Sequence, residues 1–116
     1  MMNKYALFAF TGEAMCFIHV LLNGLDLQAK GQEVKIIIEG AACGLVPKLG
    51  EAGHPFHQLY TKAREAGLIA GVCKACAQKM GGLEAAQAQG LNILADMSGH
   101  AGMAPYFLEG YRIITF

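Results

Sequence analysis

Short and almost uninterrupted apolar runs recur along this chain, and they constrain its fold more than any other feature. Each run spans five or six residues and is bounded by glycine or polar residues. Runs of this length are typical of β-strands. A strand with one solvent-exposed face alternates apolar and polar residues. Because these runs lack that alternation, they indicate a parallel sheet that is covered on both faces. The predicted strands are Tyr5–Phe10, Glu33–Ile38, Leu68–Val72, Leu91–Ala95 and Tyr111–Phe116.

Helical segments separate these runs. Glu13–Lys30 predicts a long helix that ends at Gly31, and its first half is apolar almost all round, which predicts burial on more than one side. The alternation of strand and helix predicts a three-layer α/β/α fold with a five-stranded, mostly parallel sheet, built as a single domain over residues 1–116. The shorter predicted helices are Ala41–Leu49, Pro55–Ala66 with Pro55 at its first position, Lys74–Met80, Leu83–Gln89 and Pro105–Leu108.

The charge balance narrows the classes of partner. The 9 Lys and Arg residues cancel the 9 Asp and Glu residues, which leaves no electrostatic attraction to nucleic acid or to an anionic membrane. The longest apolar stretch, Ala14–Leu22, is shorter than the about 20 residues of a membrane-spanning helix. Four cysteines are too few for a disulfide scaffold, and we therefore expect a cytoplasmic protein.

The chain is rich in apolar residues for its length. Hydrophobic residues make up 54% of it and charged residues 16%, whereas charged residues reach about 25% in an ordinary soluble domain. This excess predicts apolar surface between subunits, and hence a homo-oligomer. The six methionines are interpreted as core filler.

Chemistry is expected at the carboxyl ends of the strands, where parallel α/β sheets gather their ligands. Cys73 is the strongest candidate there, because it stands between a predicted strand and a predicted helix. Unpaired N–H groups at the helix start and the charge of Lys74 favour its thiolate form, which is the nucleophilic one. The alternative reading of Cys73 is a buried structural cysteine.

Cys73 and Cys76 form a Cys-x-x-Cys motif. Residues three apart share one face of a helix, so Cys76 is placed to act as a resolving thiol. A thioredoxin-like protein would also need a proline just before a later strand, and none of the three prolines stands there. Zinc is less favoured, because one such motif supplies two ligands and Cys43, His54 or His57 would have to be brought in by the fold. We therefore expect no metal.

Three carboxylates also stand near strand ends. Glu13 begins a helix, where a carboxylate is favoured, and Glu39 and Asp96 end strands and are expected in solvent. Carboxylates close to Cys73 would oppose its thiolate. His100 is the histidine best placed to reach the strand ends as an acid, a base or a hydrogen-bond donor.

Other conspicuous residues are given structural roles. Cys16 and His19 lie in the most apolar helix and are expected in the core, or for His19 at an interface, and Cys43 could border the Cys73 site. The glycine-rich segment Gly99–Met103 lacks the spacing of a phosphate-binding loop. We therefore expect no nucleotide and no other cofactor.

Three segments carry a family resemblance. Leu22–Val34 looks like a first helix that ends in "AKGHEV", Val72–Gly81 is similar to a cysteine segment that joins a strand to a helix, and Gly110–Phe116 looks like an "ADRVITF" ending. Together they make the chain resemble the DsrE/DsrF-like family of small sulfur-relay proteins along essentially its whole length. This resemblance implies a parallel five-stranded α/β/α fold and a trimeric or hexameric assembly.

The resemblance also implies a site. In the relay members a cysteine accepts sulfur as a persulfide and passes it to a partner, and only Cys73 matches that cysteine. Cys76 is not part of the relay pattern, and Tyr111 replaces the usual acidic residue of the ending.

The function hypothesis is a small sulfur carrier that works between donor and acceptor proteins, with Cys73 as nucleophile and Cys76 as an auxiliary thiol. The other candidate binding residues are Gly12, Glu39, Lys74 and His100. Two alternatives stay open: a non-catalytic oligomeric binding module for an unknown ligand, and a dithiol redox protein that forms a Cys73–Cys76 disulfide.

Overall fold

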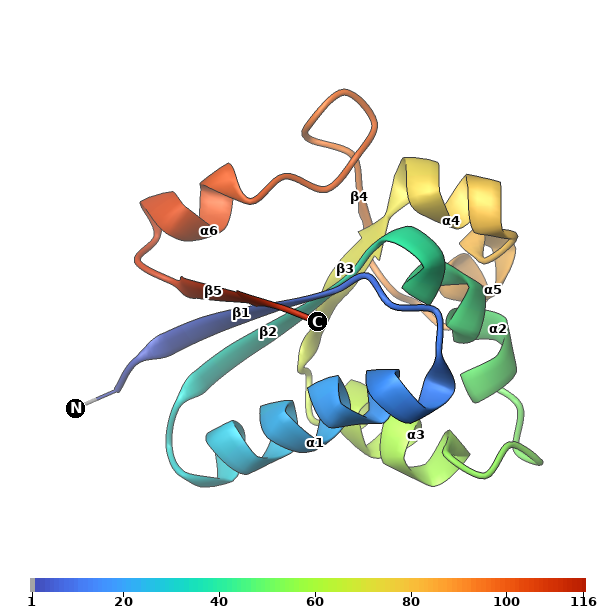
Figure 1. Ribbon diagram of the computed structural model, residues 1–116, viewed down its shortest axis with the longest axis horizontal. Helices are drawn as coiled ribbons and strands as arrows, with labels where there is room; N and C mark the ends of the chain where they lie inside the picture. The colour runs from blue at the N-terminus through green and yellow to red at the C-terminus, as the bar shows by residue number, and fades with distance from the viewer. Residues whose placement is uncertain (1) are drawn as a thin grey trace.

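The five predicted strands form one sheet in the computed structural model, which describes residues 2–116 (Figure 1). The strand order is β4-β3-β2-β1-β5, and every neighbouring pair is parallel. The prediction of a mostly parallel sheet is confirmed. The strands are β1 (Lys4–Ala9), β2 (Glu33–Ile38), β3 (Ile69–Cys73), β4 (Ile93–Leu94) and β5 (Arg112–Thr115).

Helices cover both faces of this sheet, as the three-layer prediction requires. Helices α1 (Ala14–Ala29) and α3 (His57–Glu65) pack against each other on one face, and α6 (Ala104–Leu108) lies on the other (Figure 1). The remaining helical elements are η1 (Gly40–Gly44, a 3₁₀ helix), α2 (Leu45–Leu49), α4 (Lys74–Met80) and α5 (Leu83–Ala88). Helix α3 begins at His57, two residues after Pro55, so the predicted place of Pro55 as the first helical residue is wrong.

Helix α1 buries one face, where we predicted burial on several sides. Phe17, Val20 and Leu21 pack into the core, and Gly24 lets the helix approach the sheet, since a Cβ there would lie 3.0 Å from Cδ1 of Ile36. The opposite face is open, with Met15 62% exposed. Because only one side of α1 meets the sheet, Cys16 and His19 are exposed, and their predicted core positions are wrong within this single chain.

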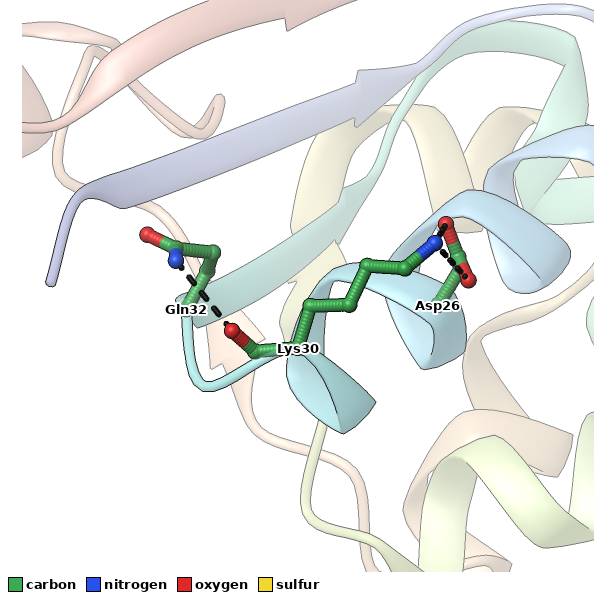
Figure 2. Close-up of polar contacts among 3 residues, drawn as sticks. All are labelled: Asp26, Lys30 and Gln32. Atoms are coloured by element: carbon green, nitrogen blue, oxygen red, sulfur yellow. Dashed lines mark hydrogen bonds and ion pairs between the residues drawn. The ribbon is translucent and has the colours of Figure 1, made fainter.

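The turn from α1 into β2 explains the end of Leu22–Val34, one of the three segments that carry the family resemblance. Lys30 pairs with Asp26 at 2.9 Å, and the Lys30 carbonyl accepts a hydrogen bond from Nε2 of Gln32 at 3.3 Å (Figure 2). Gly31 has φ of +82°, a conformation that favours glycine. This segment therefore sets the entry into β2 and lies at the amino ends of the strands.

Strand β5 departs from the prediction that both faces of every strand are covered. It pairs with β1 alone and forms one edge of the sheet. Three of its four residues are exposed, Ile114 among them at 43%. The covered strands are β1, β2 and β3, whose carboxyl halves form the centre of the core.

The topology decides which strand ends meet. From β1 to β4 each strand is placed beside its predecessor in one direction, and the chain then returns across the sheet to β5. The strand order reverses between β1 and β5, so the point where parallel sheets commonly bind ligands lies at the carboxyl ends of those two strands. The carboxyl ends of β3 and β4 lie toward the other edge of the sheet. Cys73 pairs with Leu94 there. No helix within residues 2–116 has the length and apolar character needed to cross a membrane.

Candidate functional site

Cys73 ends β3 and directly precedes α4, as predicted. Its side chain is fully buried, and its backbone is still extended, with φ of −63° and ψ of 122°. The sulfur accepts a hydrogen bond from the backbone N–H of Ala101 at 3.4 Å. A thiol that accepts a backbone N–H is stabilised in its anionic form.

Gly71 explains why the chain beyond β4 reaches Cys73. A Cβ at this position would lie 2.7 Å from Cγ of Leu94 and 2.8 Å from the carbonyl oxygen of Asn92. Glycine therefore lets β4 pack closely against β3, where the N–H of Val72 donates to the Asn92 carbonyl at 2.9 Å. This close pairing brings the segment after β4 over the end of β3.

A tight turn in that segment positions His100. Met97 and His100 exchange two backbone hydrogen bonds of 2.8 and 2.9 Å, and the two central residues, Ser98 and Gly99, have φ of +50° and +89°. Positive φ at both central residues is the signature of a hairpin turn of type I′. The Gly99 carbonyl also accepts the N–H of Ala75 at 2.9 Å, which ties the turn to α4.

His100 meets both cysteines of the Cys-x-x-Cys motif. Its Nδ1 lies 3.4 Å from Sγ of Cys73 and 3.7 Å from Sγ of Cys76. The two sulfur atoms and the ring nitrogen all lie within 4.8 Å of one another. The structure thus places His100 at the predicted nucleophile, as its position after a strand end indicated.

Cys76 lies in the first turn of α4 and is half-buried. Burial raises the pKa of the Cys76 thiol, and a hydrogen bond with Cys73 raises it further. Lys74, the first residue of α4, is exposed. The junction of β3 and α4 therefore presents a fully buried thiol, Cys73, beside a half-buried one, Cys76.

Cys43 borders this site from η1, a position that the sequence left open. Its side chain is fully buried, and its Sγ donates to the Ile38 carbonyl at 3.5 Å and approaches the Cys73 carbonyl at 3.9 Å. Burial, followed by the two nearby thiols, raises the pKa of Cys43 to about 12. Cys43 thus stays a thiol and packs beneath the site.

Glu39 contradicts the prediction that the strand-end carboxylates lie in solvent. It directly follows β2, and its side chain is only 6% exposed. Burial, followed by the charge of Asp96, raises its pKa to about 7. Asp96 is exposed and accepts the N–H of Gly102 at 3.2 Å, and Glu13 is exposed at the start of α1, so both of those predictions are confirmed.

An apolar cavity of about 400 Å³ lies beside the cysteine cluster and was missed by sequence reasoning. Ala101, whose N–H contacts Cys73, forms part of its wall, and Glu39 contributes the carboxyl group. Met97 is 54% exposed at its rim, so the reading of all six methionines as core filler is wrong. The full lining is Phe10, Glu39, Met97, Ala101, Met103, Ala104 and Phe107.

Three of the remaining candidates lie outside the cluster. Gly12 has a close-packing role, since a Cβ there would lie 2.9 Å from Cβ of Ala41. His54 and His57 belong to the segment around the start of α3: Nδ1 of His54 accepts the Phe56 N–H at 3.0 Å, and Nδ1 of His57 lies 2.9 Å from the Leu49 carbonyl. The imidazole at the cysteines is that of His100.

Comparison with known proteins places this arrangement in a family. The sequence model of the "DsrE/DsrF-like family" matches residues 5–116. An uncharacterised protein of Methanocaldococcus jannaschii is 35% identical over 97 residues, which cover 84% of this chain and 77% of that protein. An uncharacterised protein of Archaeoglobus fulgidus is 39% identical over 51 residues, or 44% of this chain and 84% of its own. No solved structure matches this chain significantly.

Proposed function

Because the chain belongs to the DsrE/DsrF-like family, we propose that it is a small sulfur carrier whose Cys73 accepts sulfur as a persulfide and passes it to a partner protein. The observation that carries this proposal is the contact of Cys73 Sγ with two groups at 3.4 Å, the Nδ1 of His100 and the N–H of Ala101. Sulfur transfer starts from a thiolate, and both groups favour one at Cys73.

The two contacts act by different means. The N–H of Ala101 is fixed by the backbone and donates to the sulfur whatever its charge. In the tautomer that carries its proton on Nδ1, His100 donates a second hydrogen bond to the sulfur. In the tautomer that carries its proton on Nε2, Nδ1 can accept the thiol proton and leave a thiolate–imidazolium pair. Both arrangements lower the cost of negative charge on a sulfur that is shielded from water.

The transfer step needs no oxidant. The Cys73 thiolate attacks the outer sulfur of a persulfide on the donor, the sulfur–sulfur bond of the donor breaks, and the donor leaves as a thiolate. The acceptor thiolate then attacks the outer sulfur of the Cys73 persulfide and releases the Cys73 thiolate. Each step moves one neutral sulfur atom, so the oxidation level of the protein is restored at the end of the cycle.

The burial of Cys73 gives Cys76 a part in this cycle. Cys73 is fully buried in the single chain, whereas Cys76 is half-buried and within 4.8 Å of it. Attack by Cys76 on the inner sulfur of the Cys73 persulfide forms a Cys73–Cys76 disulfide and releases sulfide, and a thiol reductant from outside the chain then has to reduce this disulfide before the next cycle. We propose that Cys76 is this auxiliary thiol, and that access of a partner to Cys73 requires His100 and Ala101 to move off the sulfur.

Peptide mass spectrometry after exposure to a persulfide donor tests the proposal. We expect one added sulfur atom on Cys73 that reductant removes and that is absent in Cys73→Ser. Cys16→Ser is the matched control, because Cys16 is an exposed thiol outside the cluster. A Cys73 that stays unmodified while Cys16 and Cys76 react would overturn the proposal.

A dithiol redox protein is the second candidate function, and the proximity of the two sulfur atoms favours it. It differs from a sulfur carrier in one decisive respect. A redox protein loses its activity equally in Cys73→Ser and Cys76→Ser, whereas a carrier with Cys76→Ser still accumulates the Cys73 persulfide. The same mass spectra, read on both variants, separate the two functions.

We further propose that the carrier is a cytoplasmic homo-oligomer, a trimer or a hexamer. The apolar surface that supports this includes Phe107 at 61% exposure, Leu108 at 87% and Met97 at 54%. Phe107 and Met97 line one cavity, so this surface is continuous across α6 and the turn that holds His100. Light scattering on Leu108→Asp should then give a smaller mass than on the unmodified chain, and an unchanged monomeric mass in both would contradict it.

A further inference from the structure

We propose that Cys73, Cys76 and His100 form a binding site for one zinc ion, with three protein ligands and an open fourth position. Two thiol sulfurs and an imidazole nitrogen are donors that zinc prefers, and hard cations such as magnesium prefer oxygen. These three donor atoms lie within 4.8 Å of one another. The inference concerns metal binding alone and does not depend on sulfur transfer.

The two sulfur–nitrogen distances match those around zinc. With Zn–S of about 2.3 Å, Zn–N of about 2.0–2.1 Å and tetrahedral angles, neighbouring sulfur and nitrogen ligands lie about 3.5–3.6 Å apart. The observed separations from Nδ1 of His100 are 3.4 Å to Cys73 and 3.7 Å to Cys76. The site therefore needs only small side-chain movements to accept the ion.

The ligands are held by backbone that is already fixed. Cys73 and Cys76 are linked by the first turn of α4, and His100 is held by the paired hydrogen bonds to Met97. The N–H of Ala101 on the Cys73 sulfur is the kind of outer contact that orients a metal-bound thiolate. Preorganisation of this kind lowers the entropic cost of assembling the site when zinc binds.

Charge also favours a divalent cation here. Zinc binding requires both thiols to be deprotonated, and two thiolates with a neutral imidazole exactly offset the two positive charges of the ion. Without a cation, two thiolate sulfurs within 4.8 Å of each other would repel. The ion thus permits a charge state that the cluster alone resists.

Three protein ligands leave the fourth tetrahedral position open. Structural zinc sites fill all four positions with protein ligands, whereas sites with three ligands exchange the fourth. The chemistry of the site indicates water, or a thiolate or sulfide from outside the chain, as the fourth ligand. His100 is exposed and Cys76 is half-buried, so the ion is reached from solvent on that side.

Zinc titration of the reduced chain against a chromophoric chelator, with no sulfur donor present, tests this site. We expect one zinc ion per chain. Cys76→Ser and His100→Ala should each lower the affinity for zinc at least about 100-fold, because loss of a direct ligand should cost at least as much as loss of a residue that only contacts a ligand. Cobalt in place of zinc should give the strong visible bands of a tetrahedral thiolate site, and Cys76→Ser should lose them. Cys76 and His100 are chosen because neither is fully buried, so both variants should fold.

Cys16→Ser and His19→Ala are the matched controls, since both residues are exposed on α1. Unchanged affinity in Cys76→Ser and His100→Ala, or equal losses in the control variants, would overturn the inference. Persulfide formation is measured separately, with a chelator present. Zinc binding without sulfur uptake would refute the carrier function alone, and sulfur uptake without zinc binding would refute the metal site alone.

Discussion

Replacing Glu39 with glutamine should stabilise the fold in alkaline solution and leave it unchanged in acid. Burial and the Asp96 charge raise the pKa of Glu39 from 4.5 to about 7. At 1.36 kcal/mol per pKa unit, this difference corresponds to about 3 kcal/mol of unfolding free energy. The cost is absent below pH 4.5, where Glu39 is protonated in both the folded and the unfolded chain. It grows as pH rises and is complete above about pH 7, where the folded chain ionises as well.

Urea unfolding at several pH values measures this effect. Glu39→Gln keeps the shape of the protonated side chain, so it should match the parent at acidic pH and exceed its free energy of unfolding by up to about 3 kcal/mol at pH 8. Asp96→Asn should give a smaller gain, because it removes only the second cause of the raised pKa. Glu13→Gln changes an exposed carboxylate and is the control. A gain for Glu39→Gln that is the same at every pH would refute the reasoning.

Two further predictions concern packing and thiol access. In a urea titration, Gly71→Ala should lower the free energy of unfolding by about 1–3 kcal/mol, because its Cβ would meet Leu94 and the Asn92 carbonyl within 2.8 Å. Gly53→Ala is the control and should be close to neutral, because a Cβ there meets nothing within 4 Å. In a native alkylation time course followed by mass spectrometry, exposed Cys16 should react first and buried Cys43, whose pKa is raised to about 12, should react last. Faster labelling of Cys43 than of Cys16 would contradict the burial of η1.

Sequence patterns predicted the order and type of the elements well, because strand runs and helix ends are local signals. Glu33–Ile38 and Lys74–Met80 have the bounds that the structure gives them. Burial was harder to predict, because it depends on which neighbours the fold supplies. Helix α1 meets the sheet on one side only, so its apolar first half is partly exposed. Strand β5 is an edge strand, where Ile113 packs against the core and Ile114 is exposed.

The candidate site was partly predictable for the same physical reason. The Cys-x-x-Cys motif is local, and the placement of Cys73 between strand and helix follows from the residues around it. His100 could be proposed only as a residue near a strand end, because its contact with Cys73 depends on the close pairing of β3 with β4 through Gly71 and on the turn that follows. The apolar cavity depends on α6 and β1 together, and no single stretch of sequence contains both.

From the sequence, carboxylates close to Cys73 are expected to oppose its thiolate form, and the structure shows where these charges lie. Glu39, Asp96, Cys73 and Cys76 gather at one end of the sheet. Burial is the main cause of the raised pKa of Cys43 and of Cys76, and the negative charge of Glu39 contributes to both. With a pKa of about 7, Glu39 carries only part of its charge at neutral pH, which relieves some of that opposition. The remaining negative charge has to be met by hydrogen-bond donors, by a positively charged His100 or by a bound cation. The sulfur-carrier proposal relies on the hydrogen-bond donors and on His100, and the zinc proposal relies on the cation. Both proposals use the same lone pairs of the cysteine sulfurs, so one chain can carry sulfur or bind zinc, but not both at the same time.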